Sequence, residues 1–239
     1  MTMIVGNEHY LDISRGRVLN TSTIHGFGSH TTVTTSLTTV WAPGGIYVYP
    51  ASALVMSVVS TNVNDTVAGT GLRSLLIEGL DINRARITEV VVLNGTTPVN
   101  TVQGFFRINQ VLGTSAGSTG ANVGDITITN TAVTYAFIAA TEGRSQMGLW
   151  SLPATQAAYA TGLNFSTATG KSVEVQTWLR PPSGVWYKVG STYINAAAFQ
   201  VVLDPPTKVP RGSDIEFRAI ATAASTPCSV GFDLIFVTE

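Results

Sequence analysis

The sequence predicts an all-β protein, an antiparallel β-sandwich or jelly roll with an extended N-terminal arm. Hydrophobic residues recur at every second position through most of the chain, which is the spacing of a strand with one buried face. Short stretches rich in Gly, Pro, Asn and Ser separate these segments. About a dozen strands at such spacing are typical of sandwiches and jelly rolls.

The clearest strands lie in the C-terminal part of the chain. At 172–179, valines and a leucine alternate with polar residues, and at 214–221 Ile215 and Phe217 alternate with Asp214 and Glu216. This alternation predicts that the two carboxylates face solvent. A strand at 229–237 is apolar on both faces near its end. Further strands are expected at residues 31–41, 54–60, 74–80, 86–93, 104–111, 125–130, 135–139, 146–152, 157–165, 185–193 and 199–203.

The domain organisation is predicted to be simple. Residues 30–239 are expected to form a single sandwich, because neither a constant repeat nor a long polar linker marks a boundary. Residues 1–29 show weak patterning and are interpreted as an arm that docks on a neighbouring subunit. The glycine-rich stretch 113–124 is expected to be a long exposed loop. The first ten residues lack the basic start and apolar stretch of a signal peptide, which favours retention in a cytoplasm.

The chain is low in charge. Only 11% of its 239 residues are charged, 44% are hydrophobic, and the formal net charge is −1. Weak repulsion between copies favours self-association, so we expect a homo-oligomer, with a trimer as the preferred assembly. No basic cluster for nucleic acid and no apolar stretch long enough for a bilayer is present, so neither partner is expected. Cys228 is the only cysteine, which excludes an intrachain disulfide.

Histidines that could act as catalytic bases are few. His9, His25 and His30 all lie in the predicted arm, where a base would lack a rigid support. We interpret them as surface or interface residues. The alternative is a metal on a symmetry axis, bound by His25 or His30 from neighbouring subunits.

Carboxylates that could flank a glycosidic bond are more numerous. The candidates are Asp65, Glu78, Asp81, Glu89, Asp125, Glu142, Glu174 and Glu216. Most of them occupy predicted turns or solvent faces. Asp81 with Asn83 lacks the regular spacing and terminal Glu of a calcium loop. We therefore expect no enzymatic activity, no cofactor and no resident metal.

Aromatic residues gather beside two turns, at 43–45 and 181–184. Tryptophan and tyrosine on strand faces pack in cores, anchor protein interfaces or bind sugars. We favour a core or intersubunit role, with glycan binding as the alternative. The candidates are Trp41, Tyr47, Trp178, Trp186, Tyr187 and Tyr193.

Residues 74–128 contain a recognisable succession of motifs. A strand ends on Gly-Leu-Asp at 79–81, the next closes on Leu-Asn-Gly-Thr at 93–96, and a Phe-Phe-Arg strand follows at 105–107. This succession resembles structural proteins of marine tailed phages, especially relatives of the cyanophages, and it continues more loosely at 146–159. The glycine-rich turn of that pattern is replaced here by Ile-Asn-Arg-Ala at 82–85.

The resemblance implies a component of a virus particle, such as a head decoration, knob or tail protein. We therefore expect a non-enzymatic structural protein that is made in a bacterial host cytoplasm and assembles on the phage capsid. Its partners would be copies of itself and other virion proteins, such as the major capsid or tail proteins. Two alternatives are a tail or receptor-binding protein that recognises host surface glycans and a single jelly-roll major capsid protein.

Overall fold

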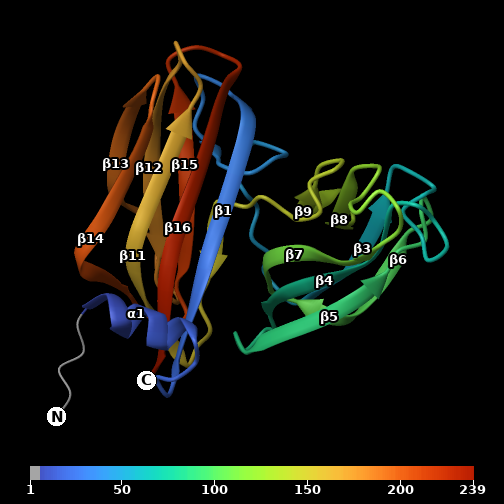
Figure 1. Cartoon of the computed structure of the whole chain (residues 1–239), viewed down its shortest axis with the longest axis horizontal. Coiled ribbons are helices and arrows are strands. Elements are labelled where there is room, and N and C mark those ends of the chain that lie inside the picture. Colours follow the sequence, from blue (N-terminus) through green and yellow to red (C-terminus); the bar gives the residue numbers. More distant parts are fainter. Residues whose placement is uncertain (1–5) are drawn as a thin grey trace.

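The protein consists of two β-sandwiches that lie side by side (Figure 1) in a computed structural model that describes residues 6–239. Every strand pair in the described residues is antiparallel. The strands contain far more residues than α1 (Gly6–Ser14), the one helix of the described part of the chain. The predicted all-β, antiparallel sandwich class is confirmed. The division into two sandwiches is the principal difference from the sequence-based expectation.

The first sandwich is built from both ends of the chain. One sheet has the order β1-β16-β11-β14 and the other β10-β15-β12-β13, with β2 also paired to β15. The strands are β1 (Thr21–Val33), β2 (Thr38–Thr39), β10 (Leu149–Ser151), β11 (Gln156–Thr167), β12 (Ser172–Arg180), β13 (Tyr187–Asn195), β14 (Ala198–Val209), β15 (Asp214–Ala221) and β16 (Thr226–Thr238).

The second sandwich is inserted between β2 and β10 of the first. Its two sheets have the orders β6-β3-β8-β9 and β5-β4-β7. The strands are β3 (Leu54–Ser60), β4 (Leu72–Leu80), β5 (Arg86–Val92), β6 (Val99–Phe105), β7 (Arg107–Ala116), β8 (Ile126–Asn130) and β9 (Val133–Ile138).

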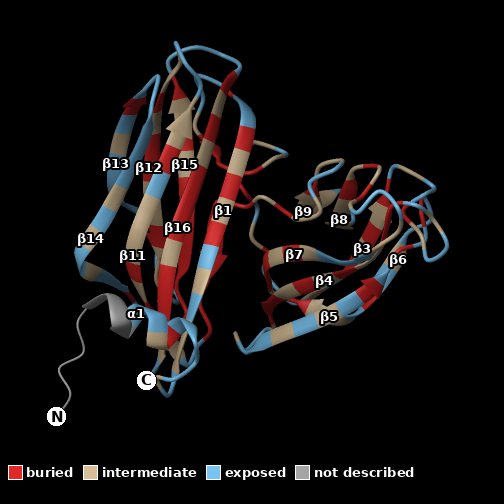
Figure 2. Cartoon of the chain, in the orientation of Figure 1, coloured by how far each residue is buried: buried red, intermediate tan, exposed pale blue. Residues whose placement is uncertain are grey.

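Each sandwich has its own hydrophobic cluster, whereas residues 30–239 were expected to form one sandwich. Phe217 and Phe232 lie at the centre of the first cluster, and Leu75 and Phe105 at the centre of the second. Figure 2 shows the buried residues along the inner strands of both sandwiches. The composition of the two connections, at 40–53 and 139–148, gives no signal of this division, because neither is a polar or charged linker and the first is mostly apolar.

The predicted boundary of the N-terminal arm falls inside β1. Thr21 to Ser29 pair residue by residue with β16, so this part of the expected arm is a core strand. Its inward positions are occupied by Gly26, Gly28 and His30, all of them buried. These residues alternate as a strand requires, but they are not hydrophobic, which explains why the periodicity of this segment is weak.

The glycine-rich stretch 113–124 is also more ordered than a free loop. Its first residues belong to β7, which continues to Ala116. Its last residues are held by the buried carboxylate of Asp65, which accepts hydrogen bonds from the N–H groups of Val123 and Gly124 at 2.9 Å. Asp65 also accepts from the Ser60 hydroxyl at 2.6 Å, so this carboxylate organises loops and does not face solvent.

Cys228 lies in β16 with its thiol in the core of the first sandwich. Burial raises the pKa of this thiol to about 12, so the reactive thiolate is scarce at neutral pH. We expect Ellman's reagent to leave Cys228 unmodified in the native protein at pH 8 and to titrate one thiol after denaturation. Rapid modification of the native protein would show that this part of the core opens readily.

Candidate functional site

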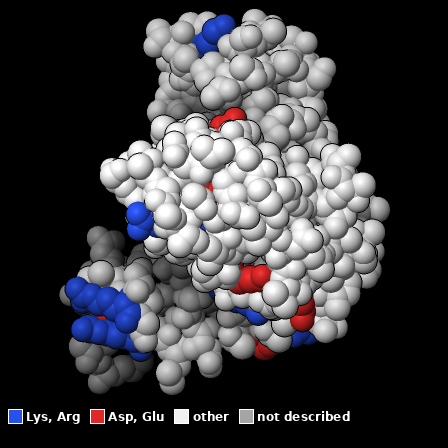
Figure 3. All heavy atoms as spheres, turned by 90° about the vertical axis from the view of Figure 1, so that its right-hand side faces the viewer, with Lys and Arg blue, Asp and Glu red and all other residues white. Residues whose placement is uncertain are grey.

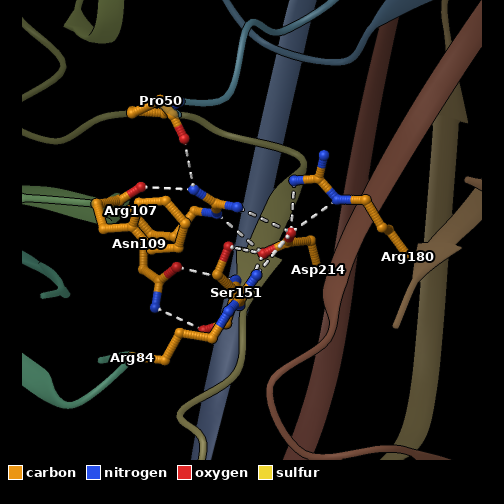
Figure 4. A network of polar contacts seen from close by, with 8 residues as sticks. Pro50, Arg84, Arg107, Asn109, Ser151, Arg180 and Asp214 are labelled. Carbon is orange, nitrogen blue, oxygen red and sulfur yellow. Dashed lines mark hydrogen bonds and ion pairs between the residues drawn. The ribbon is translucent and has the colours of Figure 1, made fainter. Parts of the chain in front are cut away.

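The two sandwiches meet at a cluster of buried charges (Figure 4). Its centre is Asp214, the first residue of β15, whose carboxylate is fully buried. Three arginines donate to this carboxylate: Arg180 at 2.6 Å, Arg84 at 3.0 Å and Arg107 at 3.1 Å. The Ser151 hydroxyl donates a further hydrogen bond at 2.7 Å. We call Asp214 and the three arginines the Asp214 cluster.

The Asp214 cluster joins elements that belong to different sandwiches. Arg180 ends β12 of the first sandwich, whereas Arg84 lies in the turn between β4 and β5, and Arg107 begins β7, both in the second. Beside the cluster, Asn109 of β7 donates to the backbone carbonyl of Ser151 at 3.0 Å and accepts from its N–H at 2.9 Å. These contacts fix the orientation of one sandwich against the other.

The charge state of Asp214 follows from its partners. Burial by itself would raise the pKa of the carboxyl, but the hydrogen bonds and charges of Arg84 and Arg107 outweigh burial and hold the pKa well below its usual range. Asp214 is therefore ionised at neutral pH and cannot serve as a general acid. Since one carboxylate faces three guanidinium groups, the cluster still carries an excess of positive charge.

Aromatic rings and backbone carbonyls accommodate the excess charge. Arg107 donates to the carbonyl oxygens of Pro50 at 3.0 Å and Phe106 at 2.7 Å. Guanidinium groups also stack on aromatic faces, with 3.9–5.2 Å between the guanidinium carbon and the ring centroid. The stacked side chains form one arginine–aromatic ladder in the order Phe106, Arg107, Tyr49, Arg180, Trp186, Arg218 and Trp178.

A second buried carboxylate, Glu216, lies beside the far end of the ladder. It accepts from Arg218 at 2.8 Å and from the Thr39 hydroxyl at 2.5 Å. The same Thr39 oxygen accepts the N–H of Tyr47 at 2.8 Å. The solvent face predicted for Asp214 and Glu216 is therefore wrong, because the connection around Tyr47 and the second sandwich cover this face of β15.

The six aromatic candidates fall into two groups. Trp178 and Trp186 belong to the ladder, and Trp41 and Tyr47 reach it through ring contacts. The ring centroids of Trp41 and Tyr47 are 5.0 Å apart, and those of Tyr47 and Tyr49 are 4.8 Å apart. The remaining two candidates, Tyr187 and Tyr193, lie on β13, where 43% and 78% of their surfaces are exposed.

The three histidines do not converge. The exposed His25 Nδ1 lies 2.7 Å from Asp233 Oδ1 across the β1–β16 pair. His30 is buried, and burial lowers its pKa. His9 lies in α1, and its side chain is outside the described part of the structure. Within the described residues, no group of three or more His, Cys, Asp or Glu side chains could hold a metal ion.

The other candidate carboxylates accept hydrogen bonds that stabilise nearby turns and strands. Asp81 accepts the N–H groups of Asn83 and Ala85 at 2.9 Å and 2.8 Å, which closes the turn between β4 and β5. Glu89 accepts two backbone N–H groups of β6. Similar single contacts engage the rest of the set, which comprises Glu78, Asp125, Glu142 and Glu174.

Comparison with known proteins gives distant likenesses. No family model matches the chain, and no curated protein matches it. A structure of the Gt strain of infectious bursal disease virus aligns with 91% of this chain and 71% of its own, at 9% identity and a TM-score of 0.24. The PBSX exported protein XepA aligns with 91% and 85%, at 13% identity and a TM-score of 0.20. Likenesses this distant establish neither a family nor a function for the chain.

Among the residues described, no helix is long and apolar enough to cross a bilayer.

Proposed function

We propose that this chain is a non-enzymatic structural subunit of a virus particle, which assembles with copies of itself and with other virion proteins. The two sandwiches act as one rigid body, because the Asp214 cluster and the arginine–aromatic ladder lock them together. Such a body transmits force between its neighbours without bending. A position on the phage capsid, as a decoration, cement or knob protein, is the placement that we favour.

The location of the charged groups is the observation that carries this proposal. Four arginines of a weakly charged chain lie in the ladder and the Asp214 cluster, where between 6% and 24% of their side-chain surfaces are exposed (Arg84, Arg107, Arg180 and Arg218). The outer surface is correspondingly poor in charge, as Figure 3 shows for the face of the second sandwich. A surface with little charge offers little repulsion to a neighbouring copy.

The likeness to phage structural proteins concerns one part of the molecule. Residues 74–128 form β4 to β7 and lead into β8, so the main motifs lie in the inserted second sandwich, whereas the looser continuation at 146–159 lies in β10 and β11 of the first. Arg107, the last residue of the Phe-Phe-Arg motif, belongs to the Asp214 cluster. The turn at 82–85, where this chain departs from the pattern, supplies Arg84 to the same cluster.

Exposed valines on the second sandwich offer a surface for assembly. Val90 and Val92 lie on the outer face of β5, with 58% and 51% of their surfaces exposed, and Val102 of β6 is 90% exposed. Val102 lies on the edge strand of the other sheet, where its N–H donates to Glu89 of β5. These exposed valines are uncharged apolar positions on the edge strands, and a second copy of the chain is the neighbour that we expect there.

Assembly through this surface is tested with Val102→Glu. The added charges would have to be buried at each contact, so the variant is expected to sediment as a monomer under conditions in which the wild-type chain forms oligomers. Val63→Glu is the matched control, since Val63 lies in a loop of the same sandwich and is 66% exposed. Both variants should retain the wild-type melting temperature. An unaltered oligomer in Val102→Glu would place the contact elsewhere.

The role in the particle is tested by the copy number and position of the chain in purified virions. A number equal to the shell subunits would favour the alternative of a major capsid protein. Tail location would favour the other alternative, a receptor-binding protein, for which the exposed Tyr187 and Tyr193 on β13 offer a place for a sugar. Absence of the chain from particles would overturn the proposal.

A further inference from the structure

The first sandwich has an open side between its two edge strands. β13 ends one sheet and β14 ends the other, and the two strands are not hydrogen-bonded to each other. Between them a cavity of ≈ 450 Å³ reaches into the core. Its apolar lining includes Leu163, Leu179, Leu203, Ile215, Phe232 and Leu234. A volume of this order falls within the usual range for small-molecule sites.

Two local features create this space. On β13, Gly190 shares a face with the buried Ile194, so its missing side chain would point inward. A Cβ atom built on Gly190 meets no other atom within 4 Å. On β14, Val202 pairs with Gly162 but Thr207 pairs with Ala160, so β14 carries extra residues and bulges between them. The cavity therefore results from a missing side chain on one wall and a bulge in the other.

The corresponding side of the second sandwich is closed. There the edge strands β5 and β6 are bridged by Glu89, which accepts the N–H groups of Val102 and Gln103 at 2.7 Å and 2.8 Å. Gln103 returns a hydrogen bond to the carbonyl of Thr88. An open side is thus not a general property of these sandwiches, and the first sandwich differs from the second in leaving this space.

The chemistry of the lining defines the ligand. The walls are aliphatic and aromatic, and Lys208 is the charged residue among those that line the cavity. Lys208 pairs across the sheet with Tyr159 and its ammonium group lies 2.6 Å from Glu239, so this charge points to the outer face and not into the cavity. We propose that this cavity binds the hydrocarbon chain of an amphiphile such as a fatty acid, with the polar head at the open side between β13 and β14.

This inference does not depend on the proposed function, because the cavity and the valines of β5 and β6 lie on different sandwiches. Binding is measured with cis-parinaric acid, a fatty acid whose fluorescence rises in an apolar site. The full-length wild-type chain is expected to bind it saturably with one site per chain. The methyl ester of the probe should bind at least as well, because the lining that the hydrocarbon chain would contact is apolar.

Gly190→Leu tests the location of the site. The leucine would occupy the cavity, so the affinity for the probe should fall at least about tenfold, while the melting temperature stays equal or rises. Val102→Leu on the second sandwich is the matched control and should leave binding unchanged. Lys208→Met should leave binding unchanged, because the Lys208 ammonium is bonded to Glu239 on the outer face.

Three results would overturn the inference. The first is no saturable binding by the wild-type chain, and the second is equal affinity in Gly190→Leu and wild type. The third is binding that appears in the monomeric Val102→Glu variant but is absent from the oligomer, because a second copy then covers the cavity. If the wild-type chain binds cis-parinaric acid but forms no oligomer, the proposed function is contradicted and the inference about the cavity is not.

Discussion

Replacing Asp214 with asparagine is expected to lower the free energy of unfolding by about 3–5 kcal/mol, the usual cost of removing one partner from a buried ion pair. The substitution keeps the size of the side chain, so no cavity forms. It leaves Arg84, Arg107 and Arg180 close together without their shared counter-charge. Urea denaturation followed by circular dichroism gives the change in free energy.

The matched control for this substitution is Asp233→Asn. Asp233 also pairs with a basic side chain, His25, but about half of each side chain is exposed. An exposed pair contributes about 0–1 kcal/mol, so the control should unfold almost as the wild type does. Equal effects of the two substitutions would mean that the Asp214 cluster is not the joint we describe.

The mode of unfolding should change as well. Because the Asp214 cluster couples two separate hydrophobic cores, its loss is expected to let the sandwiches unfold at different urea concentrations. Amide hydrogen exchange along the chain follows the strands of each sandwich separately, so the transitions of β4 and β12 would no longer coincide. Coincident transitions in Asp214→Asn would show that other contacts suffice for coupling.

The Asp214 cluster also makes the free energy of unfolding depend on pH in the acid range. The pKa of Asp214 is lower in the folded protein than in the unfolded chain, where a free aspartate titrates near pH ~3.9. Its contribution is therefore complete above that pH and is lost as the pH falls further toward the folded pKa. The difference in unfolding free energy between wild type and Asp214→Asn should be constant from pH 5 to 8 and shrink below about pH 4. A difference that grew on acidification would contradict the assigned charge.

The strand content was predictable because alternation is a local property of the sequence. Val173, Val175 and Leu179, expected on one face of a strand, are the core-facing residues of β12. The division into two sandwiches was not predictable, since the connections between them lack the polar composition of a linker. The first strand was missed in part because its inward positions are Gly26 and Gly28.

The Asp214 cluster could not be predicted from local pattern. Asp214 and Arg84 are separated by 130 residues, and the alternation of charged residues on β15 is the same for a solvent face as for a face covered by another domain. A weak signal existed: the neighbouring strand presents Trp178 and Arg180 on the same side as these charges. Aromatic rings beside arginines indicate stacking, which favours a covered face.

The gathering of aromatics was predictable, but its purpose was not. Members of both predicted groups come together, because Tyr49 links Tyr47 to Arg180 and Trp186, whereas Tyr187 and Tyr193 stay outside the ladder. Tyr49 is not among the predicted candidates, since one tyrosine among loop residues carries no periodic signal. Ring stacking on arginines is determined by the meeting of two sandwiches, which only the fold reveals.

The second large effect is expected at Gly28, where the backbone of β1 lies directly against the backbone at Val40 and at Gly148. A Cβ atom on Gly28 would lie 2.1 Å from the backbone nitrogen of Gly148 and 2.7 Å from the carbonyl oxygen of Val40. Gly148 also donates to Val40 at 2.7 Å and accepts from Phe217 at 2.8 Å. These are the points at which the chain leaves the first sandwich for the second and returns.

Gly28→Val is therefore expected to cost about 3 kcal/mol or more, the upper range for overpacking a core. The clash involves backbone atoms, which cannot rotate away as a flexible side chain can. Thermal unfolding measures the loss, and the soluble fraction on expression reports failure to fold. Gly190→Val is the matched control: it places the same side chain on a strand of the same sandwich, where a Cβ meets nothing.

A wild-type melting temperature in Gly28→Val would contradict the close packing of β1 against Gly148. It would mean that β1 can move away from Gly148 without a loss of stability. The hydrogen bonds of Gly148 to Val40 and Phe217 would then not depend on close packing against Gly28. The rigidity of the joint would then rest on the Asp214 cluster alone. The double variant Gly28→Val, Asp214→Asn tests whether the two sites act independently. Losses of unfolding free energy that add indicate independent sites, whereas losses that do not add indicate two parts of one joint.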